Sequence, residues 1–135
     1  MNRTPRTPAP PRPSRVALGR AGEDLAARHL EARGYRILER GFRTRDGEID
    51  LVADDGGTVV FVEVKTRSGT ACGRPAEAVD GRKQRRLLRA ARVWLHRHGA
   101  TERPCRFDVI EILSRPGEAV VANHIPDAFQ EGGMA

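Results

Sequence analysis

Hydrophobic and polar positions divide the chain into two helical and five extended segments. Apolar residues recur at helical spacing from Arg15 to Arg33, and Gly34 follows as a natural helix end. A second helix, rich in leucine and arginine, is predicted to begin at Ala76 or at Gly81 and to end at His98.

The extended segments show alternating apolar and polar residues or short β-branched runs, bounded by glycine and proline. They are predicted at residues 35–44, 48–53, 58–66, 105–113 and 118–125. The resulting order α-β-β-β-α-β-β predicts an α/β sandwich, in which a mixed central β-sheet is flanked by helices. A chain of 135 residues fits one such domain, which we place at residues 16–130.

Residues 1–15 have a different composition. They hold five of the nine prolines and four arginines but no acid, so a disordered tail is predicted. No apolar run approaches the roughly 20 residues of a membrane helix, and the tail lacks the apolar core of a secretion signal. We therefore expect a cytoplasmic protein with no membrane partner. The net charge of +6 favours a polyanionic partner, although four of these charges lie in the tail.

Charged residues interrupt the hairpin that residues 48–66 are predicted to form. Side chains alternate along a strand, so Glu48 and Asp50 are expected on one face, with Ile49 and Leu51 on the other. The Asp-Asp-Gly-Gly sequence between the two strands is typical of a tight turn. If the turn has an even number of residues, the charged side chains of the first strand and those of the second strand lie on the same face of the hairpin.

In the second strand of the hairpin, Glu63 and Lys65 share a face. One register places Glu48 across from Glu63 and another places Asp50 there, so carboxylates approach within about 4.5–8 Å. Like charges this close are unfavourable unless a cation lies between them, and Mg²⁺ takes carboxylate oxygens, waters and phosphate as ligands. With Lys65 in reach of the same spot, the pattern favours metal-assisted phosphodiester hydrolysis.

A solvated outer face of the hairpin is the alternative, with Lys65 simply neutralising Glu63. The choice of basic residue argues against it. Only two of the 24 basic residues are lysines, Lys65 and Lys83, which indicates a preference for an ammonium group over a guanidinium at position 65.

Several motifs together resemble one protein family. They are GRAGEDLAARHLEARGYRILERGFRTRDGEIDLV, VVFVEVKTR, GRKQRRLLRAARVWL, CRFDV and a terminal I-x-x-A-F. From about Leu18 to Phe129 the chain closely resembles the YraN-like uncharacterised protein family, whose members look like small relatives of archaeal Holliday-junction resolvases and restriction endonucleases. The resemblance implies a restriction-endonuclease-like fold and an Mg²⁺- or Mn²⁺-dependent endonuclease that acts on branched or damaged DNA in repair or recombination. Junction-cleaving relatives act as two-fold dimers, so the resemblance admits a homodimer, although no segment marks a dimer surface.

The resemblance also implies a set of site residues. The nuclease superfamily places an acid on the first helix, an Asp on one strand and Glu-x-Lys on the next, which match Glu23, Asp50, Glu63 and Lys65. Asp50 and Glu63 would bind the metal, Glu23 would complete the site, and Lys65 would orient the attacking water or stabilise charge on the phosphate. For Glu23, a favourable interaction with the helix dipole is the alternative. Glu48 belongs to the family's Gly-Glu-Ile-Asp motif but receives no fixed catalytic role.

The second predicted helix carries cations along one face, and no acid occurs between Asp80 and Glu102. That face comprises Arg82, Arg85, Arg86, Arg89, Arg92, His96 and Arg97, opposite an apolar arc of Leu87, Leu88, Ala91, Trp94 and Leu95. Solvated faces normally mix signs, so we expect these arginines, together with Lys83, to bind a nucleic-acid backbone. A non-catalytic nucleic-acid-binding protein that retains the nuclease fold is therefore the alternative function.

Gln84 falls within the apolar arc near the start of this helix, where a buried amide needs hydrogen-bond partners. Related nucleases carry a polar residue there that reaches the metal site or phosphate, so the resemblance adds Gln84 to the catalytic residues. An ordinary hydrogen bond from helix to strand is the alternative. Asp108, in CRFDV, could serve a structural role by pairing with an arginine. The four histidines and two cysteines lack the spacing of a metal-ligand set.

Overall fold

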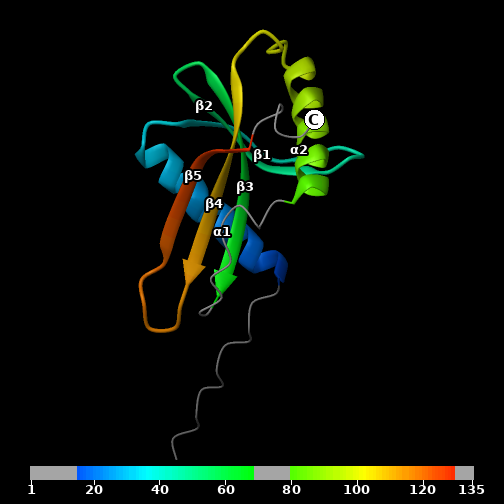
Figure 1. The fold of residues 1–135 in the computed structure, drawn as a ribbon. Coiled ribbons are helices and arrows are strands. Elements are labelled where there is room, and N and C mark those ends of the chain that lie inside the picture. The colour runs from blue at the N-terminus through cyan, green and yellow to red at the C-terminus, as the bar shows by residue number, and fades with distance from the viewer. Residues whose placement is uncertain (1–14, 69–79, 130–135) are drawn as a thin grey trace, which may run out of the picture.

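Five strands form one sheet between two helices in the part of the chain that the structure, a computed structural model, describes: residues 15–68 and 80–129 (Figure 1). The elements are α1 (Arg15–Ala32), β1 (Arg36–Arg43), β2 (Glu48–Asp55), β3 (Thr58–Ser68), α2 (Gly81–Arg97), β4 (Cys105–Ser114) and β5 (Val121–Phe129). The predicted order and the predicted mixed α/β architecture are confirmed. Residues 1–14, which make up most of the predicted tail, lie outside the described residues. None of the described helices is long and apolar enough to cross a membrane.

The strands lie side by side in sequence order, and β3 is the central one. β1–β2, β2–β3 and β4–β5 pair antiparallel, whereas β3 and β4 pair parallel. A parallel pair needs a crossover connection, and α2 lies within the segment that joins these two strands. The tight turn between β2 and β3 consists of Gly56 and Gly57, whose φ angles of 57° and 105° favour glycine.

Two hydrophobic clusters, one on each face, hold the helices to the sheet (Figure 1). Beneath α1 the buried side chains are Ala26, Ala27, Leu30, Leu51, Ala53, Val60, Val62, Ile110 and Ile112. Beneath α2 they include Ile49, Val52, Phe61, Leu87, Ala91, Trp94 and Phe107. The alternation predicted for β3 is confirmed, because Phe61 packs toward α2 while Val60 and Val62 pack toward α1.

Helix α2 begins at Gly81, the second of the two predicted starts. Asp80 is its N-cap, and the Asp80 carboxylate accepts a hydrogen bond of 2.9 Å from the backbone N–H of Lys83. The predicted basic face points outward: Arg82, Arg85, Arg86, Arg89, Arg92, His96 and Arg97 are all exposed. The opposite side of the helix supplies Leu87, Ala91 and Trp94 to the core.

Gly22 allows α1 to lie unusually close to β3. A Cβ atom added at this buried position would overlap Thr66 Oγ1 on β3. Gly22 immediately precedes Glu23, so the close approach also decides how near the Glu23 side chain comes to the sheet.

The Gly22→Ala substitution is therefore expected to destabilise the protein by about 1–3 kcal/mol, because it overpacks the helix–sheet contact. Chemical denaturation measures the change. Gly19→Ala on the same helix is the matched control, since an added Cβ there meets nothing within 4 Å and should stabilise by up to about 1 kcal/mol. Combining Gly22→Ala with Thr66→Ala should recover most of the lost stability, because the overlapping side chain is shortened. If Gly22→Ala and Gly19→Ala were equally stable, the overlap with Thr66 would not be important.

Candidate functional site

The candidate site forms where β2 separates from β3. The ladder between the two strands ends at the pair Leu51–Val62, and the next residues on each strand are Asp50 and Glu63. Asp50 Oδ2 accepts a hydrogen bond of 2.8 Å from the backbone N–H of Val64. The carboxylate thus supplies the acceptor that the β2 backbone would provide if the pairing continued. Of the two predicted registers, the structure has the one that brings Asp50 to Glu63.

The predicted face assignment of β2 is wrong at this point. Ile49 packs in the cluster beneath α2, whereas Leu51 packs beneath α1, so strict alternation breaks at Asp50. Across on β1, between the pairs Arg40–Leu51 and Phe42–Ile49, lies Gly41 with a φ of 64°. A residue with positive φ departs from strand geometry, so β1 and β2 are both irregular beside the site.

Three carboxylates converge in this gap. The ligand oxygens of Glu23, Glu48 and Asp50 all lie within 4.8 Å of one another, and we call these residues the carboxylate group. Glu23 extends from α1, while Glu48 and Asp50 come from β2. All three side chains offer the hard oxygen ligands that Mg²⁺ and Mn²⁺ prefer.

Burial and neighbouring charges make Glu23 and Asp50 hard to ionise. Burial, followed by the charges of Asp50 and Glu48, raises the pKa of Glu23 to about 7. Burial, followed by the charge of Glu63, raises the pKa of Asp50 to about 7, although the N–H of Val64 opposes the shift. Asp50 is within hydrogen-bonding contact of both Glu23 and Glu63. A hydrogen bond between two carboxyl groups needs a shared proton, so a cation could replace protons here.

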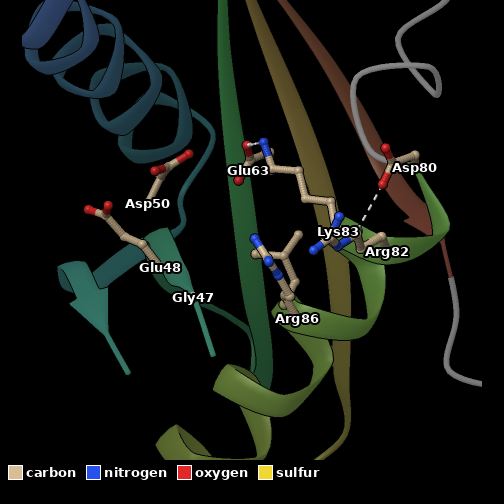
Figure 2. A pocket seen from close by; sticks show the side chains of 9 residues that line it. Gly47, Glu48, Asp50, Glu63, Asp80, Arg82, Lys83 and Arg86 are labelled. Carbon is tan, nitrogen blue, oxygen red and sulfur yellow. Dashed lines mark hydrogen bonds and ion pairs between the residues drawn. The ribbon is translucent and has the colours of Figure 1, made fainter. Parts of the chain in front are cut away.

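Helix α2 supplies the opposite wall of the site. Lys83 Nζ forms an ion pair with Glu63 Oε1, and Glu63 is 7% exposed. Figure 2 shows the Lys83 side chain extending from the first turn of α2 toward Glu63, with Asp50 and Glu48 on the facing side. Together they enclose a cavity of about 450 Å³ that is lined by Gly47, Glu48, Asp50, Glu63, Asp80, Arg82, Lys83, Arg86 and Leu87.

The predicted site residues do not all meet here. The structure brings together Glu23, Asp50 and Glu63. Lys65 is exposed on β3 and Gln84 is half-buried on α2, and neither is among the described residues that line the cavity. The predicted nucleic-acid-binding residues fall into two groups. Those that line the cavity are Arg82, Lys83 and Arg86. Those that lie on the exposed face of α2 away from the cavity are Arg85, Arg89 and Arg92.

Two features of the site were missed in the sequence. Glu48 joins the carboxylate group although it was given no role, and its position two residues before Asp50 was the available signal. Lys83 contacts an acidic side chain instead of only following a phosphate backbone. The sequence feature that could have indicated this role is the residue type, since Lys83 is one of only two lysines in the chain.

Asp108, on β4, has the structural role predicted for it, because it pairs with Arg106. Its fully buried carboxylate accepts hydrogen bonds from Arg106, from His124 Nε2 at 2.7 Å and from the backbone N–H of Asp127. Burial opposes ionisation, but these donors hold the pKa of Asp108 below its ordinary value. The network fastens the edge strand β5 to β4.

Comparison with known proteins places the chain in a family. The model of the family described as "Uncharacterised protein family UPF0102" matches residues 22–112. A UPF0102 protein of Symbiobacterium thermophilum is 53% identical over 112 residues, which cover 83% of this chain and 95% of the relative. One from Frankia casuarinae is 54% identical over 84% of this chain and 96% of the relative.

The chain belongs to the UPF0102 family. This confirms the YraN-like resemblance noted in the sequence. A UPF0102 protein of Geotalea uraniireducens is 46% identical over 84% of this chain and 90% of the relative. The segment that the UPF0102 model matches contains the carboxylate group, Glu63 and Lys83, so the candidate site lies within the part of the chain that defines the family.

The raised pKa values predict an unusual dependence of stability on pH. Without a bound cation the folded protein holds protons on Asp50 and Glu23 that the unfolded chain releases near pH 4, so stability should fall as pH rises from about 4 to about 7. Asp50→Asn should remove part of this loss and keep the hydrogen bond to Val64. We expect it to stabilise the protein at pH 8 in EDTA, because it removes a charge that neighbouring acids repel. Partial exposure screens this repulsion, so the expected gain is only about 1–2 kcal/mol.

Thermal unfolding in EDTA between pH 4.5 and pH 8 measures this effect. Asp24→Asn is the control, because Asp24 neighbours Glu23 but is exposed beside Arg40. At pH 4.5 wild type and Asp50→Asn should be nearly equal in stability. If Asp50→Asn is instead the less stable protein at pH 8, the carboxylate crowding is not what the pKa values indicate.

Proposed function

We propose that the protein is a metal-dependent endonuclease that hydrolyses phosphodiester bonds in DNA, with branched or damaged DNA as its substrate class. The observation that carries the proposal is the charge of the cavity walls: acids from β2 and β3 face cations from α2 across the same cavity. A phosphodiester bound with a divalent cation combines a positive centre with anionic oxygens, which this arrangement complements. The choice of DNA, and of branched or damaged DNA, follows the resemblance to junction resolvases.

The carboxylate group fits a divalent cation. Ligand oxygens around Mg²⁺ lie roughly 3–4 Å apart, given metal–oxygen distances of about 2.0–2.1 Å, and the oxygens of Glu23, Glu48 and Asp50 are gathered within 4.8 Å. The raised pKa values of Glu23 and Asp50 come from burial and from neighbouring acids, both of which a bound cation would offset. Mg²⁺ or Mn²⁺ bound there would activate a water and offset charge on the phosphate.

The remaining residues position the substrate. Arg82 and Arg86 line the cavity beside Lys83 and can donate hydrogen bonds to phosphate oxygens. Val64 donates to Asp50 and so fixes the orientation of that carboxylate at the gap between the strands. Gly22 allows Glu23 to approach from α1.

Replacing a member of the carboxylate group should abolish cleavage. Purified protein with Mg²⁺ or Mn²⁺ is expected to nick supercoiled plasmid or cleave a branched duplex, and Asp50→Asn or Glu48→Gln should slow this about 100-fold or more, equivalent to about 3 kcal/mol. Asp24→Asn should stay within about threefold of wild type. Equal cleavage by all variants would indicate a contaminating nuclease.

A non-catalytic nucleic-acid-binding protein is the second candidate function. The exposed basic face of α2 favours it, because that face needs no metal to attract a phosphate backbone. The two functions differ in their dependence on metal. Cleavage requires Mg²⁺ or Mn²⁺, whereas simple backbone binding persists in EDTA and weakens with salt.

The basic face should contribute to binding under both functions. Arg85→Gln combined with Arg89→Gln is expected to weaken duplex binding in EDTA and to reduce the slope of log affinity against log salt by up to about 2. Fluorescence anisotropy at several salt concentrations measures both. Arg33→Gln, at an exposed position just after α1, is the control that loses one charge elsewhere. An unchanged slope in the double variant would exclude α2 as the binding surface.

A further inference from the structure

The first turn of α2 is an unfavourable place for cations. A helix N-terminus carries partial positive charge and favours acids, yet the first turn of α2 contains no acid and begins Gly-Arg-Lys. Arg85 and Arg86 follow directly. This charge pattern opposes helix stability, so its benefit must come from what the helix end faces. It faces the acidic wall of the cavity.

Lys83 is the cation of this turn that reaches that wall. Its ammonium forms an ion pair with Glu63, and its side chain is 41% exposed whereas that of Glu63 is 7% exposed. The ammonium is therefore held at the cavity and remains accessible to a ligand. Asp80 fixes the backbone beneath it, because the cap carboxylate accepts the N–H of Lys83 itself. Figure 2 shows the side chain extended toward Glu63.

Lys65 has a different environment. It lies two residues beyond Glu63 on β3, and its partner in the parallel register with β4 is Glu111. Glu111 is buried and forms an ion pair of 2.7 Å with Arg67. The Lys65 side chain is exposed and is absent from the described residues that line the cavity. Of the two lysines, both of which are described, Lys83 is the one that forms an ion pair with an acid of the site.

We propose that Lys83, carried by α2, is the catalytic ammonium of this site, in the role that the resemblance gives to Lys65. The assignment rests on the proposed function. In hydrolysis a water oxygen bonds to phosphorus and the bond from phosphorus to the leaving sugar oxygen breaks. The water releases a proton to solvent and the sugar oxygen takes one up. Lys83 keeps its proton throughout and donates hydrogen bonds to a non-bridging oxygen of the phosphate, where charge develops.

Residue chemistry explains why this position is lysine in a chain that otherwise uses arginine. An ammonium is a compact point charge on a flexible stem, so it can exchange Glu63 for a phosphate oxygen by a small movement. A guanidinium presents its donors in a rigid planar fork, so it suits a fixed bidentate contact better than an exchange of partners. In the proposed cycle Lys83 neutralises Glu63 before a divalent cation binds and turns to the substrate afterwards.

The two lysines provide a matched comparison. Lys83→Met should lower the rate of plasmid nicking about 100-fold or more, while duplex binding in Ca²⁺ or EDTA falls by less than tenfold. Lys65→Met should lose less than tenfold in rate. Titration of Mn²⁺ by calorimetry adds a readout that needs no turnover. Lys83→Met should bind Mn²⁺ several-fold more tightly, because loss of the ammonium leaves the charge of Glu63 uncompensated beside the carboxylate group.

A purely structural ion pair predicts a different pattern. It would lower the stability of Lys83→Met but leave the cleavage rate per folded molecule unchanged, and Lys83→Arg would restore the stability and cleave at the wild-type rate. The catalytic assignment expects Lys83→Arg to fold and to bind duplex like wild type, yet to cleave at least tenfold more slowly. Circular dichroism establishes the folded fraction of each variant.

Each remaining outcome is decisive. A large loss in Lys65→Met with near-normal Lys83→Met and Lys83→Arg overturns the assignment and leaves the endonuclease intact. Normal cleavage by Lys83→Met with unchanged Mn²⁺ affinity also overturns it. Wild-type protein that nicks no DNA with either metal overturns the proposed function and the assignment together.

Discussion

Repulsion among carboxylates, at the point where β2 leaves β3, is the constraint on which the rest of the site depends. Acids from two strands and a helix are brought within a few ångströms, in a place where burial already disfavours their charge. The fold tolerates them through a few contacts: the N–H of Val64 donates to Asp50, the ammonium of Lys83 pairs with Glu63, and Arg43 pairs with Glu48. The raised pKa of Glu23 favours its protonated form. Folding stability is therefore spent on a charge arrangement that a divalent cation can relieve.

Side chains from helices on both faces of the sheet reach the acids of the site. Helices α1 and α2 pack on opposite sides, each over its own hydrophobic cluster, so their side chains would not meet across an unbroken sheet. The ladder between β2 and β3 ends just before Asp50 and Glu63, where acids from the two strands come together. Glu23, on α1, has its carboxylate within 4.8 Å of those of Glu48 and Asp50. Lys83, on α2, reaches Glu63 (Figure 2). Gly41, whose φ is 64°, lies on β1 beside Asp50, between the pairs Arg40–Leu51 and Phe42–Ile49.

Local patterns were enough to predict most of the fold. Helical spacing gave both helices, the Gly-Gly turn gave the hairpin, and the one-signed face of α2 is exposed as expected. The face of Ile49 relative to Leu51 could not be predicted, because strict alternation assumes a regular strand and the irregularity involves Gly41 on a neighbouring strand. The ion-pair partner of Lys83 could not be predicted from the sequence either. A long side chain can reach several acids, and only the packing of α2 on the sheet selects Glu63.

The position of the cavity at one end of α2 has a geometric consequence for any duplex bound there. The helix has 17 residues, and at 1.5 Å per residue it is about 25 Å long. A DNA backbone that follows its arginines for that length spans about seven base pairs, at 3.4 Å for each step along a strand. The cavity is at the first turn, so this footprint would extend to one side of the cavity. Within the described residues, the contacts of α2 with a bound duplex would thus be asymmetric about the cavity.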